Sequence, residues 1–315
     1  MSVVEVSARL RQEVGKAVVG QERAIDQVLV AILANGHILL EGVPGIAKTL
    51  LVRTMAKALA LDFTRIQFTP DLMPSDVIGT NVFDPKTTDF RLRKGPVFTQ
   101  ILLADEINRT PPKTQAALLE AMEERQVTID GIRYPLPSPF LVFATQNPIE
   151  FEGTYPLPEA QQDRFLLKVL LEYPPGNVEV EVLKRFHLGF RSQNLEQAGV
   201  QAIVDLDGLA SLRQEVEAVQ IEERIFQYVY DLVASTRKAN DILVGASPRA
   251  GLALVACSKA VASLRGRNFV IPDDVKELAL PILRHRVLLR PEAEVEGLTV
   301  DRVLTSLVDA QVVPR

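Results

Sequence analysis

The chain has few residues of the kinds that form disulfides or metal centres. Only one of its 315 residues is a cysteine, so a disulfide within the chain is excluded, and its three histidines share no local motif. We therefore expect no zinc site built from cysteine and histidine. Cys257 is flanked by Ala and Val in a predicted helix, which indicates a buried position. This cysteine usage is typical of a reducing compartment, so we expect a cytoplasmic protein.

Long hydrophobic runs are also absent. No apolar run approaches the roughly 20 residues that a membrane-spanning helix needs, so we expect no membrane span. The first sixteen residues mix charged and apolar side chains, and we expect no signal peptide there. The net charge of −5 disfavours a broad nucleic-acid surface, although it does not exclude a local basic patch. Nothing in the sequence resembles a protease or nuclease site.

The order of hydrophobic patterns predicts an α/β domain followed by a helical one. In the first half, apolar strand-like runs alternate with helical patterns, which is typical of a parallel sheet. Strands are predicted at residues 37–41, 63–69, 100–105 and 139–147, and helices at 21–35, 48–61 and 112–125. From about residue 178 the pattern is helical, with helices predicted at 221–240, 248–264 and 273–283. The length of 315 residues fits about two domains.

Two segments look like insertions into this scaffold. Residues 76–98 contain turn formers and little helical periodicity. Residues 126–134 are rich in β-branched side chains on both sides of Asp130-Gly131, which is a strong hairpin signal. Insertions on a rigid scaffold commonly carry function, so both are candidate contact surfaces.

A phosphate-binding loop is predicted at residues 42–49, with the sequence GVPGIAKT between a strand and a helix. Loop N–H groups and the helix dipole favour phosphate there. Lys48 would place its charge near the β- and γ-phosphates, and the Thr49 hydroxyl would bind Mg²⁺. Ala47 replaces the second glycine of the usual GxxxxGKT/S pattern, and we expect a Cβ to be tolerated where a helix begins. The predicted nucleotide-binding residues of the loop are Gly42, Val43, Pro44, Gly45, Ile46, Ala47, Lys48, Thr49 and Leu50.

An apolar strand that ends in two carboxylates strengthens this interpretation. Side chains alternate between the faces of a strand, so Asp105 and Glu106 must have different roles. Asp105 is predicted to hold Mg²⁺, and Glu106 to orient or deprotonate the attacking water. Asn147 ends another apolar strand, where it would position that water or contact the γ-phosphate. A simple capping role for Asn147 before Pro148 is the alternative.

These residues resemble the MoxR family of AAA+ ATPases, in its helix-2-insert group. The matching segments, in chain order, are residues 19–22, 42–49, 68–71, 103–109, 144–148, 157–160, 163–165 and 245–249. They span nearly the whole chain, and alanine at position 47 of the loop is usual for this family. The match is specific to the family and says less about the cellular role.

The resemblance implies a P-loop parallel-sheet core with helices on both faces in residues 1–195 and an all-α lid in residues 196–315. Within the core, residues 76–98 would be the helix-2 insert and residues 126–136 the hairpin before sensor 1. The implied cofactors are ATP and Mg²⁺, with Val19 and Gly20 beside the adenine. The implied activity is ATP hydrolysis by a hexameric ring that remodels or helps to assemble partner proteins, often proteins with von Willebrand factor A domains.

Two arginines gain roles from the resemblance alone. Arg164 matches the arginine finger, which reaches the γ-phosphate bound by a neighbouring subunit. Arg249 matches sensor 2, which couples the lid to the nucleotide. Taken singly, either arginine could be an ordinary surface residue. The predicted catalytic set is Lys48, Glu106, Asn147, Arg164 and Arg249, with Thr49 and Asp105 as metal ligands.

Two other functions stay open. A DNA motor would need basic clusters, which occur at residues 91–94 and 284–290 but without the interleaved aromatic residues that stack on bases. A nucleotide-loaded scaffold with negligible turnover is the other. The presence of every predicted catalytic residue type counts against the scaffold.

Overall fold

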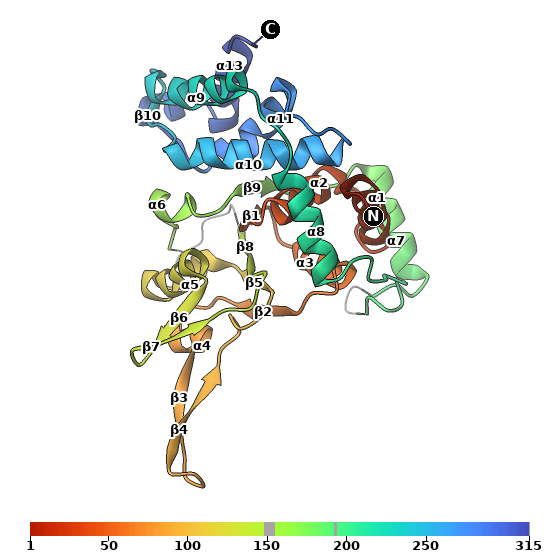
Figure 1. The fold of residues 1–315 in the computed structure, drawn as a ribbon, viewed down its shortest axis with the longest axis vertical. Helices are drawn as coiled ribbons and strands as arrows, with labels where there is room; N and C mark the ends of the chain where they lie inside the picture. Colours follow the sequence, from red (N-terminus) through yellow and green to blue (C-terminus); the bar gives the residue numbers. More distant parts are fainter. Residues whose placement is uncertain (148–154, 192–193, 315) are drawn as a thin grey trace.

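Five parallel β-strands form the central sheet (Figure 1). In spatial order they are β2 (Phe63–Gln67), β5 (Ile101–Asp105), β8 (Leu141–Gln146), β1 (Ile38–Glu41) and β9 (Leu167–Leu170). The computed structural model describes residues 1–147, 155–191 and 194–314. The predicted parallel sheet is confirmed, and β1, β2, β5 and β8 lie within the predicted ranges. Strand β9 is not predicted, because four residues that include a lysine are too few to show a strand pattern.

Helices surround the sheet and form the second half of the chain. They are α1 (Val3–Gly15), α2 (Glu22–Leu33), α3 (Lys48–Ala58), α4 (Pro74–Ile78), η1 (Ile107–Arg109), α5 (Pro112–Glu124), α6 (Glu159–Gln162), α7 (Gly176–His187), α8 (Leu206–Glu217), α9 (Glu223–Lys238), α10 (Pro248–Leu264), α11 (Pro272–Leu283), α12 (Pro291–Val295) and α13 (Val300–Ala310). The helix predicted at 248–264 has these same bounds in the structure. Within the described residues, no helix is long and apolar enough to cross a membrane.

The sheet is buried on both faces because alternate residues of each strand point to opposite sides. In β5, Ile101 and Leu103 pack into one core, which also contains side chains of α2 and α3. Leu102 and Ala104 pack into a second core, which contains side chains of α5. This arrangement confirms helices on both faces and explains why the strands read as continuous apolar runs.

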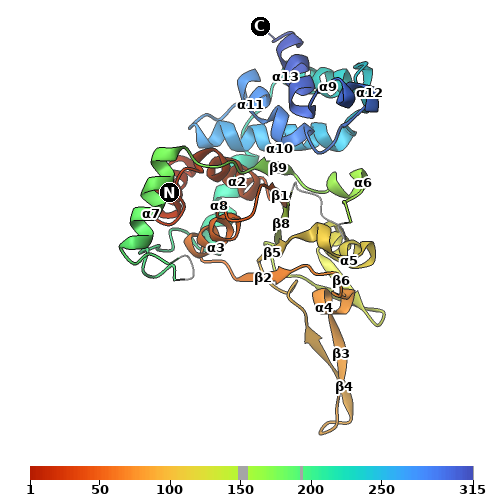
Figure 2. The same ribbon diagram turned by 180° about the vertical axis from the view of Figure 1, so that it is seen from behind.

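Both predicted insertions contain hairpins. Residues Gln126–Ile129 (β6) and Ile132–Pro135 (β7) pair around Asp130 and Gly131, which have positive φ values of 49° and 79°. The longer hairpin, β3 (Gly79–Asp84) and β4 (Asp89–Lys94), projects far from the sheet (Figure 2). It follows the short helix α4, so residues 76–98 are more regular than their turn formers suggest.

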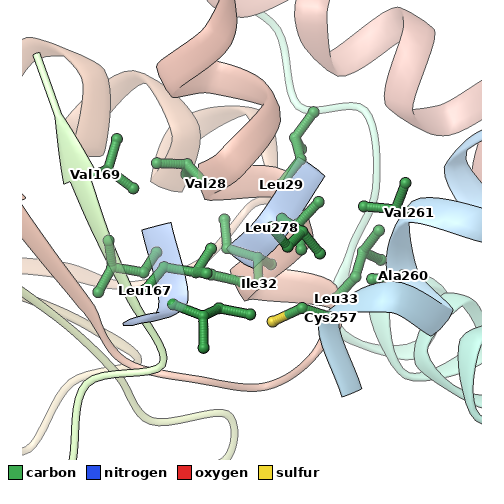
Figure 3. Close-up of a cluster of buried hydrophobic side chains, with 14 of the residues drawn as sticks. Val28, Leu29, Ile32, Leu33, Leu167, Val169, Cys257, Ala260, Val261 and Leu278 are labelled. Carbon is green, nitrogen blue, oxygen red and sulfur yellow. The ribbon is translucent and has the colours of Figure 1, made fainter. Parts of the chain in front are cut away.

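Helices α9 to α13 lie together on one side of the sheet (Figures 1 and 2). The predicted helical region is confirmed, and it also contains a short antiparallel pair, β10 (Ile242–Val244) and β11 (Leu288–Leu289). Its α10 and α11 share a buried apolar core with α2 and β9 (Figure 3). Cys257 lies in this core and is fully buried, as its flanking residues predict. The helical region is therefore packed on the α2 and β9 side of the sheet.

Candidate nucleotide-binding site

The predicted phosphate loop joins the end of β1 to the start of α3. Gly42 has no room for a side chain, since an added Cβ would lie 2.3 Å from Cδ1 of Ile46 and 2.7 Å from the carbonyl oxygen of Leu171. Gly45 has a φ of +87°, in the region that favours glycine. One glycine therefore provides space and the other provides the backbone conformation of the turn.

Ala47 corrects one expectation. We expect a Cβ to be tolerated there because the position begins a helix, yet the structure places Ala47 in the left-handed region, with φ 67° and ψ 22°. An L-residue is less stable there than glycine by about 1–2 kcal/mol. The second glycine of the usual pattern thus has a conformational reason, and Ala47 holds the loop in a strained backbone conformation.

Lys48 begins α3 and turns its ammonium group back toward the loop. Its Nζ atom donates to the carbonyl of Gly42 and, at 3.4 Å, to the carbonyl of Gln146 at the end of β8. Partial burial lowers the pKa of Lys48, and the nearby carboxylates of Asp105 and Glu106 oppose that shift. The structure therefore brings the loop lysine into the electrostatic field of both acids.

Asp105 ends β5 and is 8% exposed. Its Oδ1 atom accepts a hydrogen bond from the hydroxyl of Thr145 at 2.6 Å. Its Oδ2 atom accepts two from Arg65, at 2.9 Å from Nε and 2.7 Å from Nη2. The predicted metal ligand is thus held by two residues that the sequence analysis does not identify.

Glu106 has a different set of partners from its neighbour. Its backbone is left-handed, with φ 57° and ψ 51°, and its N–H donates to the Thr145 hydroxyl at 2.8 Å. Its carboxylate accepts from Nε2 of Gln67 at 2.8 Å and pairs with Nε of Arg109 at 3.1 Å. The two acids are therefore oriented separately, which is what different roles require.

Asn147 follows β8 directly and is buried, and Thr49 lies in the first turn of α3. With Lys48, Asp105 and Glu106, they lie at the carboxyl ends of β1, β5 and β8, the edge at which open α/β sheets bind ligands. A helix start, an ammonium group, a hydroxyl and a carboxylate are the groups that bind a nucleotide and its Mg²⁺. The donors at this edge therefore fit Mg²⁺-bound ATP.

Val19 and Gly20 lie between α1 and α2, and the chain bends at Gly20 against the segment that follows β9. Gly20 has a φ of +73°, and an added Cβ would lie 2.7 Å from Cγ1 of Val178 and 2.9 Å from Cβ of Pro174. Gln21 donates from Nε2 to the carbonyl of Glu172 at 2.9 Å. This bend is thus packed against residues 172–178.

The two predicted arginines meet on one acid, Glu123, in the last turn of α5. Arg164 pairs with Oε2 of Glu123 at 2.8 Å, and Arg249 pairs with Oε1 at 2.9 Å. A second guanidinium nitrogen of Arg164 donates to the carbonyl of Leu119 at 2.6 Å. The structure therefore brings the two arginines together.

This arginine pair lies near the amino-terminal ends of the strands, whereas the phosphate loop lies at their carboxyl ends. Helix α5 runs back from the carboxyl edge, so its last turn lies beside the start of β1. Nε2 of His37 lies 3.2 Å from the carbonyl of Met122, and Arg125 donates to the carbonyl of Asn35 at 3.1 Å. Arg249 is therefore not beside its own chain's phosphate loop, where a lid arginine acting within one subunit would lie.

Asp163, next to Arg164, anchors this edge to the helical region. Its carboxylate accepts from Nε of Arg286 at 2.7 Å and from the hydroxyl of Ser247 at 2.8 Å. Arg286 is 3% exposed at its side chain, so this ion pair is buried. The Asp163 carboxylate therefore joins the segment that carries Arg164 to Ser247, the residue that caps α10 just before Arg249.

Several site residues escape the sequence analysis. Arg65 and Gln67 are two residues apart in β2, so their side chains point to the same face of the sheet. Gln67 is in register with Asp105 on the neighbouring strand. Thr145 precedes Asn147 by two residues, so an extended chain points both side chains to the same face. Polar residues two positions apart near the end of a strand could have identified these site residues. The pattern becomes informative only when the strand order is known, and one sequence does not reveal that order.

Comparisons with known proteins identify the family of this chain. Residues 37–167 match the ATPase family associated with various cellular activities (AAA), and residues 234–307 match the AAA lid domain. The chain is 46% identical over 303 residues to the uncharacterized protein YeaC of Bacillus subtilis, covering 96% of this chain and 93% of YeaC. It is 43% identical over 312 residues to Chaperone MoxR1 of Mycobacterium tuberculosis, covering 96% and 81% of the two chains.

A solved structure shares the fold over nearly its full length. The crystal structure of an ATPase candidate from Cytophaga hutchinsonii has a TM-score of 0.88 and 46% identity, and the match covers 99% of this chain and 98% of that one. The sheet, the loop and both family matches define an AAA ATPase with a lid domain. Similarity to MoxR1 over nearly the whole chain makes the assignment narrower: this chain belongs to the MoxR family of AAA ATPases.

Proposed function

We propose that the chain is one subunit of an oligomeric, Mg²⁺-dependent ATPase whose active sites lie between subunits. The observation that carries this proposal is the separation of the phosphate loop from Arg164 and Arg249 at opposite edges of one sheet. When two such chains associate head to tail, the phosphate loop of one faces the arginines of the next, and together they form a complete site. Such an interface forms a ring when the rotation closes.

One subunit would supply the groups at the carboxyl edge. Lys48 and the loop would bind the phosphates, Thr49 and Asp105 would hold Mg²⁺, and Val19 and Gly20 would lie beside the adenine. Bound Mg²⁺ supplies positive charge to the phosphate oxygens. Glu106 would take the proton of the attacking water, with Asn147 orienting that water.

The neighbouring subunit would supply Arg164 and Arg249. A positive charge placed on the γ-phosphate stabilises the transition state without covalent chemistry, and such arginines increase the rate by about 10³–10⁵. Arg249 would then act on the neighbour's nucleotide together with Arg164, and it would couple the helical region of one subunit to the nucleotide of the next.

The work of this ATPase is proposed to be chaperone-like remodelling or assembly of partner proteins, including proteins with von Willebrand factor A domains. One relative carries the name Chaperone MoxR1. The projecting β3–β4 hairpin supports a protein contact, since Phe83 and Phe90 pack edge-to-face at 5.5 Å while remaining 50% and 66% exposed. Exposed aromatic side chains are enriched at protein interfaces.

Three residues of the basic clusters that would favour DNA are paired with acids. Arg91 pairs with Asp84 at 3.2 Å, and Arg284 pairs with Asp301 at 2.8 Å. Arg286 is buried against Asp163. These pairs support a protein substrate over DNA.

ATP turnover against protein concentration, with size measured in parallel, tests the proposal. We expect turnover per subunit to rise as oligomers form. Lys48→Ala should lose nucleotide binding, whereas Glu106→Gln and Arg164→Ala should bind ATP and hydrolyse it slowly. Turnover that ignores both assembly and Arg164 would overturn the shared site and favour a nucleotide-loaded scaffold.

A further inference from the structure

Glu123 contacts both arginines of the proposed shared site, with a different oxygen on each. Oε2 lies 2.8 Å from Nη2 of Arg164, and Oε1 lies 2.9 Å from Nη2 of Arg249. Arg164 follows α6, whereas Arg249 lies in the first turn of α10 in the helical region. A residue of α5 thus connects two cations from separate parts of the chain.

We propose that Glu123 is a positioning residue, which holds Arg164 and Arg249 side by side so that both act on the neighbouring subunit's nucleotide. This inference rests on the proposed function. Two guanidinium groups at short range repel each other, and a carboxylate between them offsets that repulsion. Without Glu123, the arginine pair would separate and present one charge where the phosphate needs two.

The two arginines depend on Glu123 to different degrees. Arg164 keeps a second contact with α5, through the carbonyl of Leu119 at 2.6 Å. The side chain of Arg249 is 52% exposed, and its ion pair with Glu123 connects it to the α/β part of the chain. Loss of Glu123 should therefore mainly displace Arg249.

The contact is suited to positioning and not to permanent locking. The side chain of Glu123 is 40% exposed, and exposed ion pairs are weak because water and salt screen them. A nucleotide phosphate carries more negative charge than one carboxylate, so it can draw the arginines away once a neighbour presents it. Glu123 would then order the pair between encounters.

A mixing experiment tests this role without needing to know the protein substrate. Glu123→Ala subunits have an intact phosphate loop but disordered arginines, whereas Glu106→Gln subunits have an inactive site but intact arginines. In a mixed oligomer, a Glu123→Ala site beside a Glu106→Gln neighbour is complete. We expect Glu106→Gln alone to lose about tenfold or more in turnover, and Glu123→Ala alone to lose about threefold to fivefold, the limit for an exposed ion pair. An equal mixture should give about 0.3 of wild-type turnover, because a quarter of the junctions in a random ring are complete, whereas without complementation it would give only about half the turnover of Glu123→Ala.

Three controls make the result specific. Glu120→Ala removes a like charge from the same helix and from the same surface hollow, and it should leave turnover unchanged. Glu123→Gln keeps the side chain's size but not its charge, so it should show the same loss as Glu123→Ala with an unchanged Tm. Half-saturating ATP should change by less than about twofold in both Glu123 variants, because the neighbour's loop binds the nucleotide.

The outcomes separate this inference from the proposed function. Recovery in a mixture of Arg164→Ala with Glu106→Gln would support the shared site itself. If that mixture recovers and the Glu123→Ala mixture does not, the positioning role is wrong while the shared site stands. If neither mixture recovers, the shared site is wrong. Faster turnover in Glu123→Ala alone would show that Glu123 restrains the arginines, which also overturns positioning.

Discussion

Arg65 donates two hydrogen bonds to a single oxygen of Asp105, at 2.9 Å from Nε and 2.7 Å from Nη2. The predicted metal ligand is therefore already paired with a cation from the neighbouring strand. A metal ion and a guanidinium group compete for the same negative charge. With Asp105 as the proposed Mg²⁺ ligand, we expect the metal requirement of ATP turnover to depend on Arg65.

Arg65→Ala should lower the Mg²⁺ concentration needed for half-maximal ATP turnover. The ion pair is half-exposed on the arginine side, and such pairs are worth up to about 1 kcal/mol, which corresponds to a change of about threefold to fivefold. A Mg²⁺ titration at saturating ATP measures the change. Arg91→Ala on the projecting hairpin is the matched control, and an unchanged or higher Mg²⁺ requirement in Arg65→Ala would contradict the competition.

Thr145→Val should reduce both stability and turnover. The Thr145 hydroxyl is fully buried, donates to Asp105 at 2.6 Å and accepts from the N–H of Glu106 at 2.8 Å. Valine has the same shape but satisfies neither group, and each buried group left without a partner costs about 1–3 kcal/mol. Urea unfolding and turnover measure the two effects. Thr145→Ser restores the hydroxyl and should recover most of both, and equal losses in the two variants would point to packing instead.

Ala47→Gly should stabilise the free protein. The left-handed conformation of Ala47 costs about 1–2 kcal/mol relative to glycine. Glycine also gives the unfolded chain more conformational freedom, which offsets about 0.4–1 kcal/mol of that gain in stability. The expected net gain is about 0.5–1 kcal/mol in the free energy of unfolding. Gly45→Ala, at a φ of +87° with open space around it, is the reverse control and should destabilise the protein. A less stable Ala47→Gly variant would argue against strain in this loop.

The parts of the site that lie on single buried strands could be predicted from the sequence. Apolar runs that end in Asp105-Glu106 and in Asn147 are visible because strands buried on both faces leave continuous hydrophobic patterns. The loop containing Lys48 is visible because its order of strand, turn and helix is local. These features need no knowledge of which strands are neighbours.

The remaining parts depend on contacts between distant segments. Arg65 and Asp105 are 40 residues apart, and Glu123 and Arg249 are 126 residues apart. Strand β2 also lacks a clear hydrophobic alternation, because none of its residues is fully buried. Neither pairing could be read from local patterns, since each depends on the strand order and on where the helical region packs.

Buried histidine makes the stability depend on pH. Nδ1 of His37 accepts from the N–H of Val142 at 3.0 Å, so Nε2 carries the proton and donates to the carbonyl of Met122 at 3.2 Å. Both contacts use the neutral ring. Burial lowers the pKa of His37 to about 4, against an ordinary value of 6.5. In the unfolded chain the ring takes up a proton as the pH falls through about 6.5, whereas the folded ring stays neutral until about pH 4.

The free energy of unfolding should therefore fall between pH 7.5 and pH 5.5, by about 1.4 kcal/mol from His37 alone. Urea unfolding at several pH values measures this loss. The His37→Gln variant should lack the part of the loss that comes from His37, because glutamine does not titrate. Burial also lowers the pKa of His285, so the variant should keep a second, similar loss. A difference between wild type and His37→Gln that does not change with pH would show that His37 is not held neutral by the fold. A difference that shrinks as the pH falls would confirm that burial of the neutral ring beside β8 gives the protein this acid sensitivity.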